Sequence, residues 1–506
     1  MRGLALVSGA LLGAAFLKGP LGWLAWVSLV PLYAALDAAL RSGAGARRAF
    51  TLGWLAGLAF YLVGMHWMLF LSEVAIEVPW LKYPAWLLGG AYLAVFPGLA
   101  AAGTAAIVRR TGAPLALVLP AVWVLVEGLR GAGELGFPWF QPGYTQHDFV
   151  PVLQLASLGG VALVTAWLLF LNGLIWRALT GPARASAALG AALVFALPFV
   201  WGQRALDAAP KGGGPRVALV QGNIAGEIKW SGEHQEEILA TFLELSRQAA
   251  AATPPPDVVI WPETATGSYL AKQPEQAHAV AAFVASAGVP VYAGYADWAR
   301  DDSGGRRFHN AAGMFTAHGP EPVVYAKRHL VPFGERMPFQ WLIPALGRIE
   351  LGQAEWTPGA EPVLFRAAGV PFSGLICFES IFPRLAREDV RAGARWLVNI
   401  TNDEWFGNSA ALYQHAAMAR FRAVENRVPL ARCANTGLTV LIDAYGRVVE
   451  RLPVFEPAVL VAVVPPAGPK TWFTRAGDWP TGLALLAVVA WSLMAAARLR
   501  RGNGSR

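Results

Sequence analysis

The chain divides into three stretches by the spacing of its apolar residues. Residues 1–203 are almost continuously apolar, residues 212–470 mix apolar and polar positions, and residues 480–497 form a second apolar run. A helix needs about 20 apolar residues to cross the hydrocarbon core of a bilayer. The pattern therefore predicts membrane-spanning helices over residues 22–40, 50–71, 85–108, 114–130, 155–176, 185–203 and 480–497.

The N-terminal run of residues 3–17 is short for a span, because Lys18, Gly19 and Pro20 end it. An apolar stretch that follows Arg2 is also typical of a signal peptide. Another predicted span follows at once, and no clear small-residue cleavage site lies between the two. We therefore expect a further membrane helix here, with a signal peptide as the alternative.

Three ionisable residues, Asp37, His66 and Glu127, lie within the apolar stretches. Ionisable groups at membrane depth cost free energy and often have a function. Our interpretation is that each makes a hydrogen bond between helices or lies near the membrane surface, and a functional role is the alternative.

Residues 212–470 alternate predicted strands and helices, which indicates an α/β domain with helices layered on sheets. The glycine-rich segment 211–215 reads as a linker, so we expect domains over residues 1–210, 211–470 and 471–506, the last being a final helix and a basic tail. Strands are predicted at residues 217–220, 258–261, 291–295, 323–325, 373–376, 396–400, 438–442 and 459–463, and helices at 233–252, 275–287, 380–393 and 411–427.

Composition narrows the class of protein. Hydrophobic residues make up 55% and charged residues 15% of the chain, whereas an ordinary soluble domain has roughly a quarter charged residues. This excludes a soluble enzyme of ordinary composition and a disordered chain. Two cysteines are too few for a disulfide scaffold or a multi-cysteine metal protein.

The formal net charge of +8 is compatible with a nucleic-acid-binding protein, but the placement of the arginines indicates a membrane protein instead. Basic residues gather in every second connection between the predicted spans, as the positive-inside rule expects for cytoplasmic loops. The C-terminus is then cytoplasmic, and residues 212–470 lie outside the cytoplasm, which argues against a nucleic-acid partner. The basic residues are Arg2, Arg41, Arg47, Arg48, Arg109, Arg110, Arg177, Arg184, Arg498, Arg500, Arg501 and Arg506.

Three reactive side chains follow predicted strands, where loops of α/β proteins commonly carry catalytic groups. They are Glu263, Lys327 and Cys377. Together a carboxylate, an ammonium and a thiol can perform covalent catalysis, because the carboxylate takes the thiol proton and the ammonium stabilises an oxyanion. Taken singly, each also has an ordinary structural interpretation, and Cys377 could form a disulfide with Cys433.

Several longer motifs surround these residues. Taken together and in this order, they resemble the nitrilase superfamily, and with the predicted spans they resemble the apolipoprotein N-acyltransferase family. The motifs are Gln221-Gly-Asn223, Trp261-Pro-Glu263, the run from Tyr325 to Glu335, Ile376-Cys377-Phe378-Glu379, the run from Asn399 to Gly407, and in the membrane half Glu127-Gly-Leu-Arg130, Gly136-Phe-Pro-Trp139 and Gly143-Tyr144.

The resemblance implies a multi-span α-helical membrane domain of eight helices and an α/β nitrilase-like α-β-β-α sandwich. It implies transfer of an acyl chain from a membrane phospholipid to the N-terminal amine of a diacylglyceryl-cysteine lipoprotein, through a thioester on the enzyme. In this scheme Glu263 is the general base, Lys327 stabilises the oxyanion and Cys377 is the nucleophile. Glu335 matches a second essential glutamate that orients either Lys327 or the amine.

Three further positions match residues that the family uses: Trp230, Phe378 and Glu379. The family often has tyrosine where this chain has Phe378, so we expect packing or a backbone N–H at that position. Beside the resemblance, residues 337–346 are rich in large apolar side chains. We expect them to form a lid that enters the bilayer, with Trp341 in contact with lipid, and ordinary core packing is the alternative.

We further expect a monomer in the bacterial cytoplasmic (inner) membrane, with the catalytic domain on the extracytoplasmic side. Its partners would be a phospholipid acyl donor and a diacylglyceryl lipoprotein acceptor, and we expect no cofactor and no metal. Two alternatives remain. One is a membrane-tethered nitrilase or amidase that hydrolyses a small carbon–nitrogen substrate with the same three residues. The other is a transporter or lipid-binding protein with a non-catalytic external domain.

Overall fold

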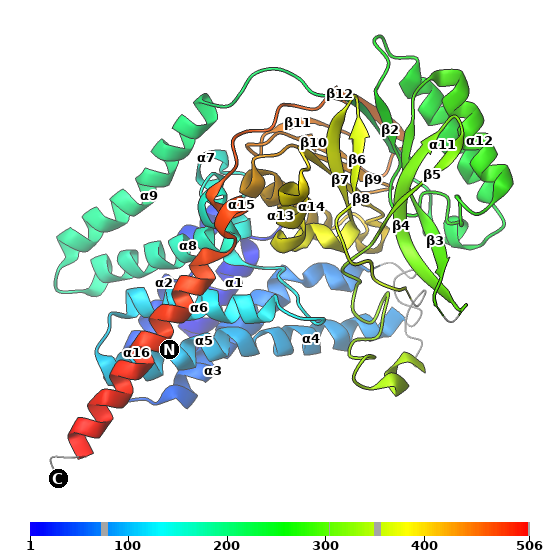
Figure 1. Ribbon diagram of the computed structural model, residues 1–506. Coiled ribbons are helices and arrows are strands. Elements are labelled where there is room, and N and C mark those ends of the chain that lie inside the picture. The colour runs from blue at the N-terminus through cyan, green and yellow to red at the C-terminus, as the bar shows by residue number, and fades with distance from the viewer. Residues whose placement is uncertain (72–78, 303, 349–355, 504–506) are drawn as a thin grey trace. The chain divides into compact units, whose positions relative to one another are not determined.

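The computed structural model describes residues 1–71, 79–302, 304–348 and 356–503, so Arg506 of the basic tail lies outside the described residues. The chain forms two compact units (Figure 1). The first contains Met1–Ala208, Asn408–Gln414 and Arg475–Arg506, and the second contains Ala209–Gly407 and His415–Thr474.

The first unit is helical. Its α-helices are α1 (Arg2–Ala14), α2 (Val30–Arg41), α3 (Ala46–Gly64), α4 (Lys82–Leu93), α5 (Val95–Thr111), α6 (Leu115–Arg130), α7 (Val150–Leu153), α8 (Ala156–Thr180), α9 (Arg184–Asp207) and α16 (Trp479–Asn503). Short 3-10 turns lie between them at η1 (Gly22–Trp26), η2 (His66–Phe70), η3 (Pro79–Leu81) and η4 (Pro142–Gln146).

Six helical segments of the described chain are long and apolar enough to cross a membrane, which indicates a membrane protein and confirms six of the predicted spans. The segment predicted at residues 114–130 forms α6, a helix of 16 residues, and the N-terminal run forms α1, with 13 residues. The six segments are Gly22–Arg41, Ala46–Phe70, Lys82–Thr111, Ala156–Thr180, Arg184–Asp207 and Trp479–Arg498.

Helix α1 is packed into this unit against α3. A Cβ atom on Gly9 would lie 1.9 Å from the Ala56 carbonyl oxygen, so the two backbones meet where only glycine fits. The Ser8 hydroxyl donates a hydrogen bond of 2.7 Å to the Ser28 carbonyl. The N-terminal run is therefore an integral helix of the described unit.

In the described part of the chain, Asp37, His66 and Glu127 each make their hydrogen bond or ion pair with a residue three or four positions away in sequence. Asp37 pairs with Arg41 at 2.7 Å, and Glu127 accepts a hydrogen bond of 2.9 Å from the Trp123 indole. Local pairing of this kind lowers the cost of holding a polar group in an apolar helix.

Gln414 is a fully satisfied buried amide within the first unit. Its Oε1 accepts hydrogen bonds from the indoles of Trp67 (3.1 Å) and Trp139 (2.9 Å). Its Nε2 donates to the carbonyls of Phe16 (2.9 Å) and Gly64 (3.2 Å). Because an unpaired buried amide is costly, this network anchors the segment Asn408–Gln414 among the membrane helices.

The second unit contains two six-stranded sheets, ordered β12-β1-β2-β3-β4-β5 and β11-β10-β9-β8-β7-β6. Strands β1, β2 and β3 pair in parallel, as do β7, β8 and β9, and the other neighbours are antiparallel. The strands are β1 (Arg216–Gln221), β2 (Val258–Ile260), β3 (Val291–Arg300), β4 (Arg306–Thr316), β5 (Gly319–Ala326), β6 (Leu364–Ala367), β7 (Val370–Ile376), β8 (Trp396–Thr401), β9 (Leu430–Ala434), β10 (Val440–Ile442), β11 (Val448–Arg451) and β12 (Ala458–Val463).

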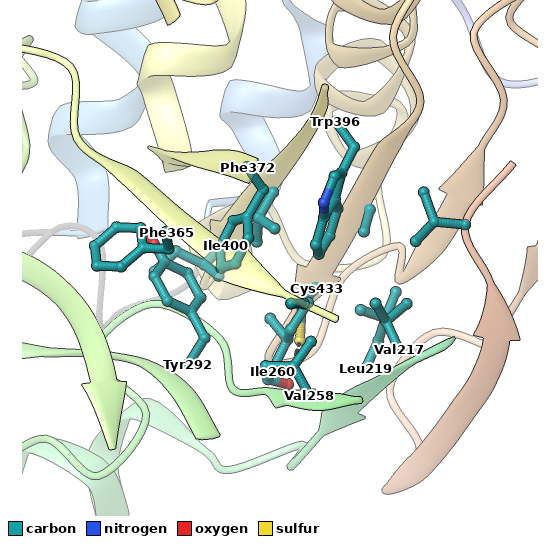
Figure 2. Packing of buried hydrophobic residues seen from close by; sticks show 14 of the residues in the cluster. Val217, Leu219, Val258, Ile260, Tyr292, Phe365, Phe372, Trp396, Ile400 and Cys433 are labelled. Atoms are coloured by element: carbon teal, nitrogen blue, oxygen red, sulfur yellow. Dashed lines mark hydrogen bonds between the residues drawn. The ribbon is translucent and has the colours of Figure 1, made fainter. Parts of the chain in front are cut away.

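The main core of this unit lies between the two sheets (Figure 2). Val258 and Ile260 of one sheet meet Trp396 and Ile400 of the other, and all four are essentially inaccessible to water. Cys433 lies in the same core, where its sulfur is 3.3 Å from the carbonyl oxygens of both Val220 and Ile260 and the thiol can donate to either. Both cysteines are free, so the alternative of a Cys377–Cys433 disulfide is wrong.

Helices cover the sheets and complete the α-β-β-α sandwich. Helices α11 and α12 pack their apolar side chains on the outer face of the first sheet, in a cluster that includes Phe242 and Phe283. Helices α13 and α14 lie beside the second sheet (Figure 1). The predicted two-part fold is thus confirmed. The remaining helices and turns of this part of the chain are α10 (Gly226–Trp230), α11 (Gln235–Ala250), α12 (Pro274–Ala287), η5 (Pro344–Arg348), η6 (Cys377–Ile381), α13 (Pro383–Ala392), η7 (Glu404–Phe406), α14 (Ala410–Asn426) and α15 (Trp472–Ala476).

Candidate active site

Glu263 lies just beyond β2 and is almost completely buried. Its Oε1 accepts a hydrogen bond of 2.8 Å from Asn310 Nδ2 on β4, and its Oε2 accepts one of 3.0 Å from the Asn402 backbone N–H. A Cβ atom on Gly294 would lie 2.8 Å from the Glu263 Cα, so β3 passes closer to this residue than any other side chain would allow. The carboxylate is therefore held firmly in one orientation.

Lys327 follows β5 and places its ammonium between two carboxylates. Its Nζ lies 2.7 Å from Glu335 Oε1 and 3.4 Å from Glu263 Oε1. Glu335 also accepts hydrogen bonds from Asn310 Nδ2 (3.3 Å) and from the Val331 backbone N–H (2.8 Å). The structure thus brings Glu263, Lys327 and Glu335 together, and it adds Asn310 as a bridge between the carboxylates.

The carboxylates determine the charge of Lys327. Burial alone would lower the pKa of a lysine, because the charged form loses its water. Here Glu335 and Glu263 outweigh burial and raise the pKa of Lys327 above its ordinary value. The side chain is therefore a fixed cation at neutral pH.

Cys377 is the first residue after β7 and begins the turn η6. Its φ is +49°, a left-handed conformation that costs a non-glycine residue about 1–3 kcal/mol. Although part of the residue remains exposed, the surrounding protein displaces enough water to raise the pKa of the thiol. Glu263 raises that pKa further, whereas Lys327 lowers it. The resting sulfur is thus a neutral thiol close enough to both groups to respond to their charges.

Glu379 connects the nucleophile turn to the end of β5. It is completely buried, and its Oε2 accepts hydrogen bonds of 2.7 Å from both the Ile376 backbone N–H and the Tyr325 hydroxyl. Its Oε1 accepts from the backbone N–H groups of Arg328 (2.6 Å) and His329 (3.2 Å). Since Ile376 precedes Cys377 and Arg328 follows Lys327, this carboxylate fixes the spacing of the two reactive residues.

A buried network supports the carbonyl of Cys377. His415 Nε2 lies 3.1 Å from the Cys377 oxygen and 3.0 Å from the Ser380 hydroxyl. Its Nδ1 lies 2.9 Å from Asp403 Oδ1, and Asp403 Oδ2 accepts a hydrogen bond of 2.5 Å from Arg432. Although burial acts in the opposite direction, Arg432 and His415 hold the pKa of Asp403 well below its ordinary value.

Lys229 lies beside Glu263 and is the chain neighbour of Trp230. Lys229 is buried, its Nζ donates a hydrogen bond of 3.0 Å to the Glu263 carbonyl, and it lies 5.4 Å from the centre of the Trp230 ring. Burial lowers the pKa of Lys229 to about 8, although Glu263 and Glu404 act in the opposite direction. The sequence drew attention to Trp230 but not to Lys229.

The last two predicted positions are Phe378 and Trp341. The ring of Phe378 packs 5.2 Å from the ring of Phe382, which fits the packing role expected from its lack of a hydroxyl. Trp341 is 70% exposed and lies in a segment where Leu342 and Ile343 are also largely exposed. No group of three or more His, Cys, Asp or Glu side chains in the described ranges could hold a metal ion.

The arrangement can perform acyl transfer through sulfur. A buried carboxylate can accept the thiol proton, a permanent cation can stabilise the negative oxygen of a tetrahedral intermediate, and a strained turn presents the sulfur.

Comparison with known proteins identifies the family. Residues 8–174 match the model of the apolipoprotein N-acyltransferase N-terminal domain, and residues 216–472 match the carbon-nitrogen hydrolase model. A protein from Geobacter metallireducens named apolipoprotein N-acyltransferase is 35% identical, over 98% of this chain and 93% of its own length. The chain belongs to the apolipoprotein N-acyltransferase family.

Other members of this family give the same result. The proteins of the same name from Methylococcus capsulatus and Azotobacter vinelandii are 36% and 34% identical, over 94% and 97% of this chain and 92% and 94% of theirs. Among solved structures, a mutant of the amidase from Nesterenkonia sp. AN1 is 18% identical and covers 54% of this chain and 95% of its own, with a TM-score of 0.38.

Proposed function

We propose that this protein transfers an acyl chain from a membrane phospholipid to the N-terminal amine of a diacylglyceryl-cysteine lipoprotein, through a thioester on Cys377. The observation that carries the proposal is the position of Lys327 between Glu263 and Glu335. Glu379 ties this lysine to the nucleophile, because it accepts hydrogen bonds from the residue before Cys377 and from the residue after Lys327. The names of the family relatives and the membrane-spanning helices support a lipid-linked substrate.

In the first half-reaction Glu263 takes the proton of the Cys377 thiol, and the sulfur attacks the ester carbonyl of the phospholipid. Lys327 and the Phe378 backbone N–H stabilise the oxyanion. When the intermediate collapses, the carbon–oxygen ester bond breaks, and the lysophospholipid alkoxide takes the proton held by Glu263. Cys377 then carries the acyl chain as a thioester.

In the second half-reaction the neutral amine of the lipoprotein attacks the thioester. Glu263 accepts a proton from the nitrogen, the carbon–sulfur bond breaks, and the proton returns to the Cys377 sulfur. The amide product is more stable than the thioester. Glu335 keeps Lys327 in position in both halves, through the 2.7 Å contact between them.

The proposal also covers topology. We place the protein as a monomer in a bacterial cytoplasmic membrane, with residues 211–470 as the extracytoplasmic catalytic domain, flanked by membrane parts at residues 1–210 and 471–506. The arginines in every second connection support this orientation. Residues 337–346 would form a lid in the membrane surface, because Trp341, Leu342 and Ile343 expose apolar surface there.

The test is to incubate the purified full chain with phospholipid vesicles and a diacylglyceryl-cysteine peptide. We expect one lysophospholipid and one N-acylated peptide per turnover, and neither product with Cys377→Ala. Release of ammonia from small soluble amides, without N-acylated peptide, would contradict the proposal and favour a membrane-tethered amidase. Unchanged transfer by Cys377→Ala would contradict it as well.

A further inference from the structure

A basic cavity of about 700 Å³ lies in the second unit, where β4 begins. Arg306, Arg307 and Arg336 line it, together with the aromatic side chains of Tyr269, Phe308 and Trp356. No acidic residue is among the described side chains that form its wall. Three guanidinium groups around one cavity favour an anionic ligand, because arginine presents several N–H donors in a planar fork.

The three arginines are not equally available. Arg307 Nε lies 3.4 Å from Asp301 Oδ2, so its charge is partly compensated. Arg306 stacks on Trp298, with its guanidinium carbon 4.5 Å from the ring centre. Stacking uses the face of the guanidinium and leaves the N–H groups at its edge able to donate. Arg306 and Arg336 are therefore the better candidates for binding an anion.

The cavity adjoins the cluster of Glu263, Lys327 and Glu335 along two segments of chain. On β4, Phe308 lies two residues before Asn310, so both point to the same face of the strand, about 7 Å apart along it. Arg336 directly follows Glu335, and the Trp356 backbone N–H donates a hydrogen bond of 3.0 Å to the Glu335 carbonyl. The cavity therefore lies next to the cluster of Glu263, Lys327 and Glu335.

We propose that this cavity binds the phosphodiester of the glycerophospholipid that donates the acyl chain, with Arg306 and Arg336 as its main ligands. This assignment rests on the proposed function. In such a lipid the glycerol backbone separates the ester carbonyl from the phosphate by a few bonds. A carbonyl held at Cys377 and Lys327 would then leave the phosphate to extend past Glu335 toward the arginines. A small neutral amide has no negative charge for these arginines to bind.

The cavity also explains how the site can select a phospholipid from other esters. Bidentate arginine–phosphate pairs fix orientation as well as contributing affinity. Binding the phosphate would hold the ester carbonyl at the sulfur, so the benefit should appear in the donor half-reaction and not in transfer to the amine.

The experiment compares two acyl donors with the full-length chain and no acceptor. Adduct formation on the protein is followed by mass with vesicles of dioleoylphosphatidylethanolamine and with p-nitrophenyl butyrate, an uncharged ester. We expect the double variant Arg306→Gln/Arg336→Gln to lower the ratio of the phospholipid rate to the aryl ester rate by about tenfold or more. Arg395→Gln, an exposed arginine elsewhere in the unit, is the matched control and should leave the ratio unchanged.

An unchanged ratio in the double variant would overturn the proposal, and so would an equal loss with both donors, because that would indicate damage to the reactive cluster. If adduct formation is normal but transfer to an acidic lipoprotein peptide slows, the cavity serves the acceptor and the assignment to the donor is wrong. A wild-type chain that forms no adduct from phospholipid, yet reacts with the aryl ester, would contradict the proposed function itself and this assignment with it.

Discussion

The ammonium nitrogen of the buried Lys327 lies 2.7 Å from Oε1 of the partly exposed Glu335. Glu263 approaches the same nitrogen at 3.4 Å. One lysine therefore neutralises part of the charge of two carboxylates, and the cluster keeps an excess negative charge next to the thiol of Cys377. Burial and, after it, the charge of Glu263 raise the pKa of the thiol, so the thiol is protonated at rest. The proposed mechanism assigns its deprotonation to Glu263.

Replacing Glu335 tests the importance of the short contact. Glu335→Gln removes the ionic partner of Lys327, so the lysine should be less firmly placed and its pKa should fall. We expect thioester formation to slow by about 10- to 100-fold, the loss of one charge-assisted hydrogen bond. Glu321→Gln, which changes an exposed carboxylate on the same strand that leads to Lys327, should have no effect. Equal rates in the two variants would exclude a role for Glu335.

The charges around Cys377 predict opposite effects on its reactivity toward iodoacetamide. Because Glu263 raises the pKa of the thiol and Lys327 lowers it, Glu263→Gln should increase the thiolate fraction and Lys327→Met should decrease it. At pH 8 the thiol is mostly protonated, so we expect alkylation of Cys377 to be faster in the first variant and slower in the second, by about tenfold for each pKa unit. Acyl transfer should fall in both. Changes of the same sign in the two alkylation rates would refute this description of the site.

Glu379 should matter for stability as well as for reactivity. In the wild type, backbone N–H groups donate to both carboxylate oxygens of Glu379. In Glu379→Gln an NH₂ group replaces one of these oxygens, so at least one N–H donor loses its acceptor. We expect a loss of about 3 kcal/mol in unfolding free energy, seen as a lower unfolding temperature of the full chain in detergent. Glu236→Gln is the control, since Glu236 is an exposed carboxylate in the first turn of α11. A variant with unchanged unfolding temperature would show that the four hydrogen bonds contribute little.

The exposed apolar segment at residues 337–346 predicts a dependence on the lipid surface. The double variant Trp341→Gln/Leu342→Gln removes apolar area that would otherwise enter the bilayer. Each Å² of apolar surface removed from water contributes about 25 cal/mol of binding free energy. We expect slower acylation of Cys377 by phospholipid in vesicles and an unchanged rate with phospholipid dispersed in detergent. Leu364→Gln, an exposed leucine on β6, provides the comparison. Equal rates of all three proteins on vesicles would disprove the lid.

Glu263 and Cys377 could be singled out in the sequence because each follows a short apolar strand. Residues 258–261 and 373–376 are short apolar runs typical of buried strands; Cys377 follows its run directly, and Glu263 follows after Pro262. Strands that pair in parallel at the centre of a sheet are buried on both faces, so their residues are continuously apolar and easily identified.

The residues that complete the site were harder to find. Strand β4 begins with the mostly polar stretch Arg306 to Asn310, and the apolar residues 311–315 that follow include no β-branched residue, so the strand was not predicted and Asn310 went unnoticed with it. Lys229 lies in a five-residue helix, where a charged residue ordinarily faces water. The network of His415, Asp403 and Arg432 joins β9, α14 and a turn, and only the folded chain brings these together.

The central claim is that Cys377 carries the acyl chain, and intact-mass measurement of the full chain after incubation with phospholipid tests it most directly. We predict a mass increase of one acyl group, located on Cys377, released by neutral hydroxylamine and passed on when a diacylglyceryl-cysteine peptide is added. An adduct that persists in Cys377→Ala, or N-acylated peptide produced at full rate without any acyl group on the protein, would contradict the account.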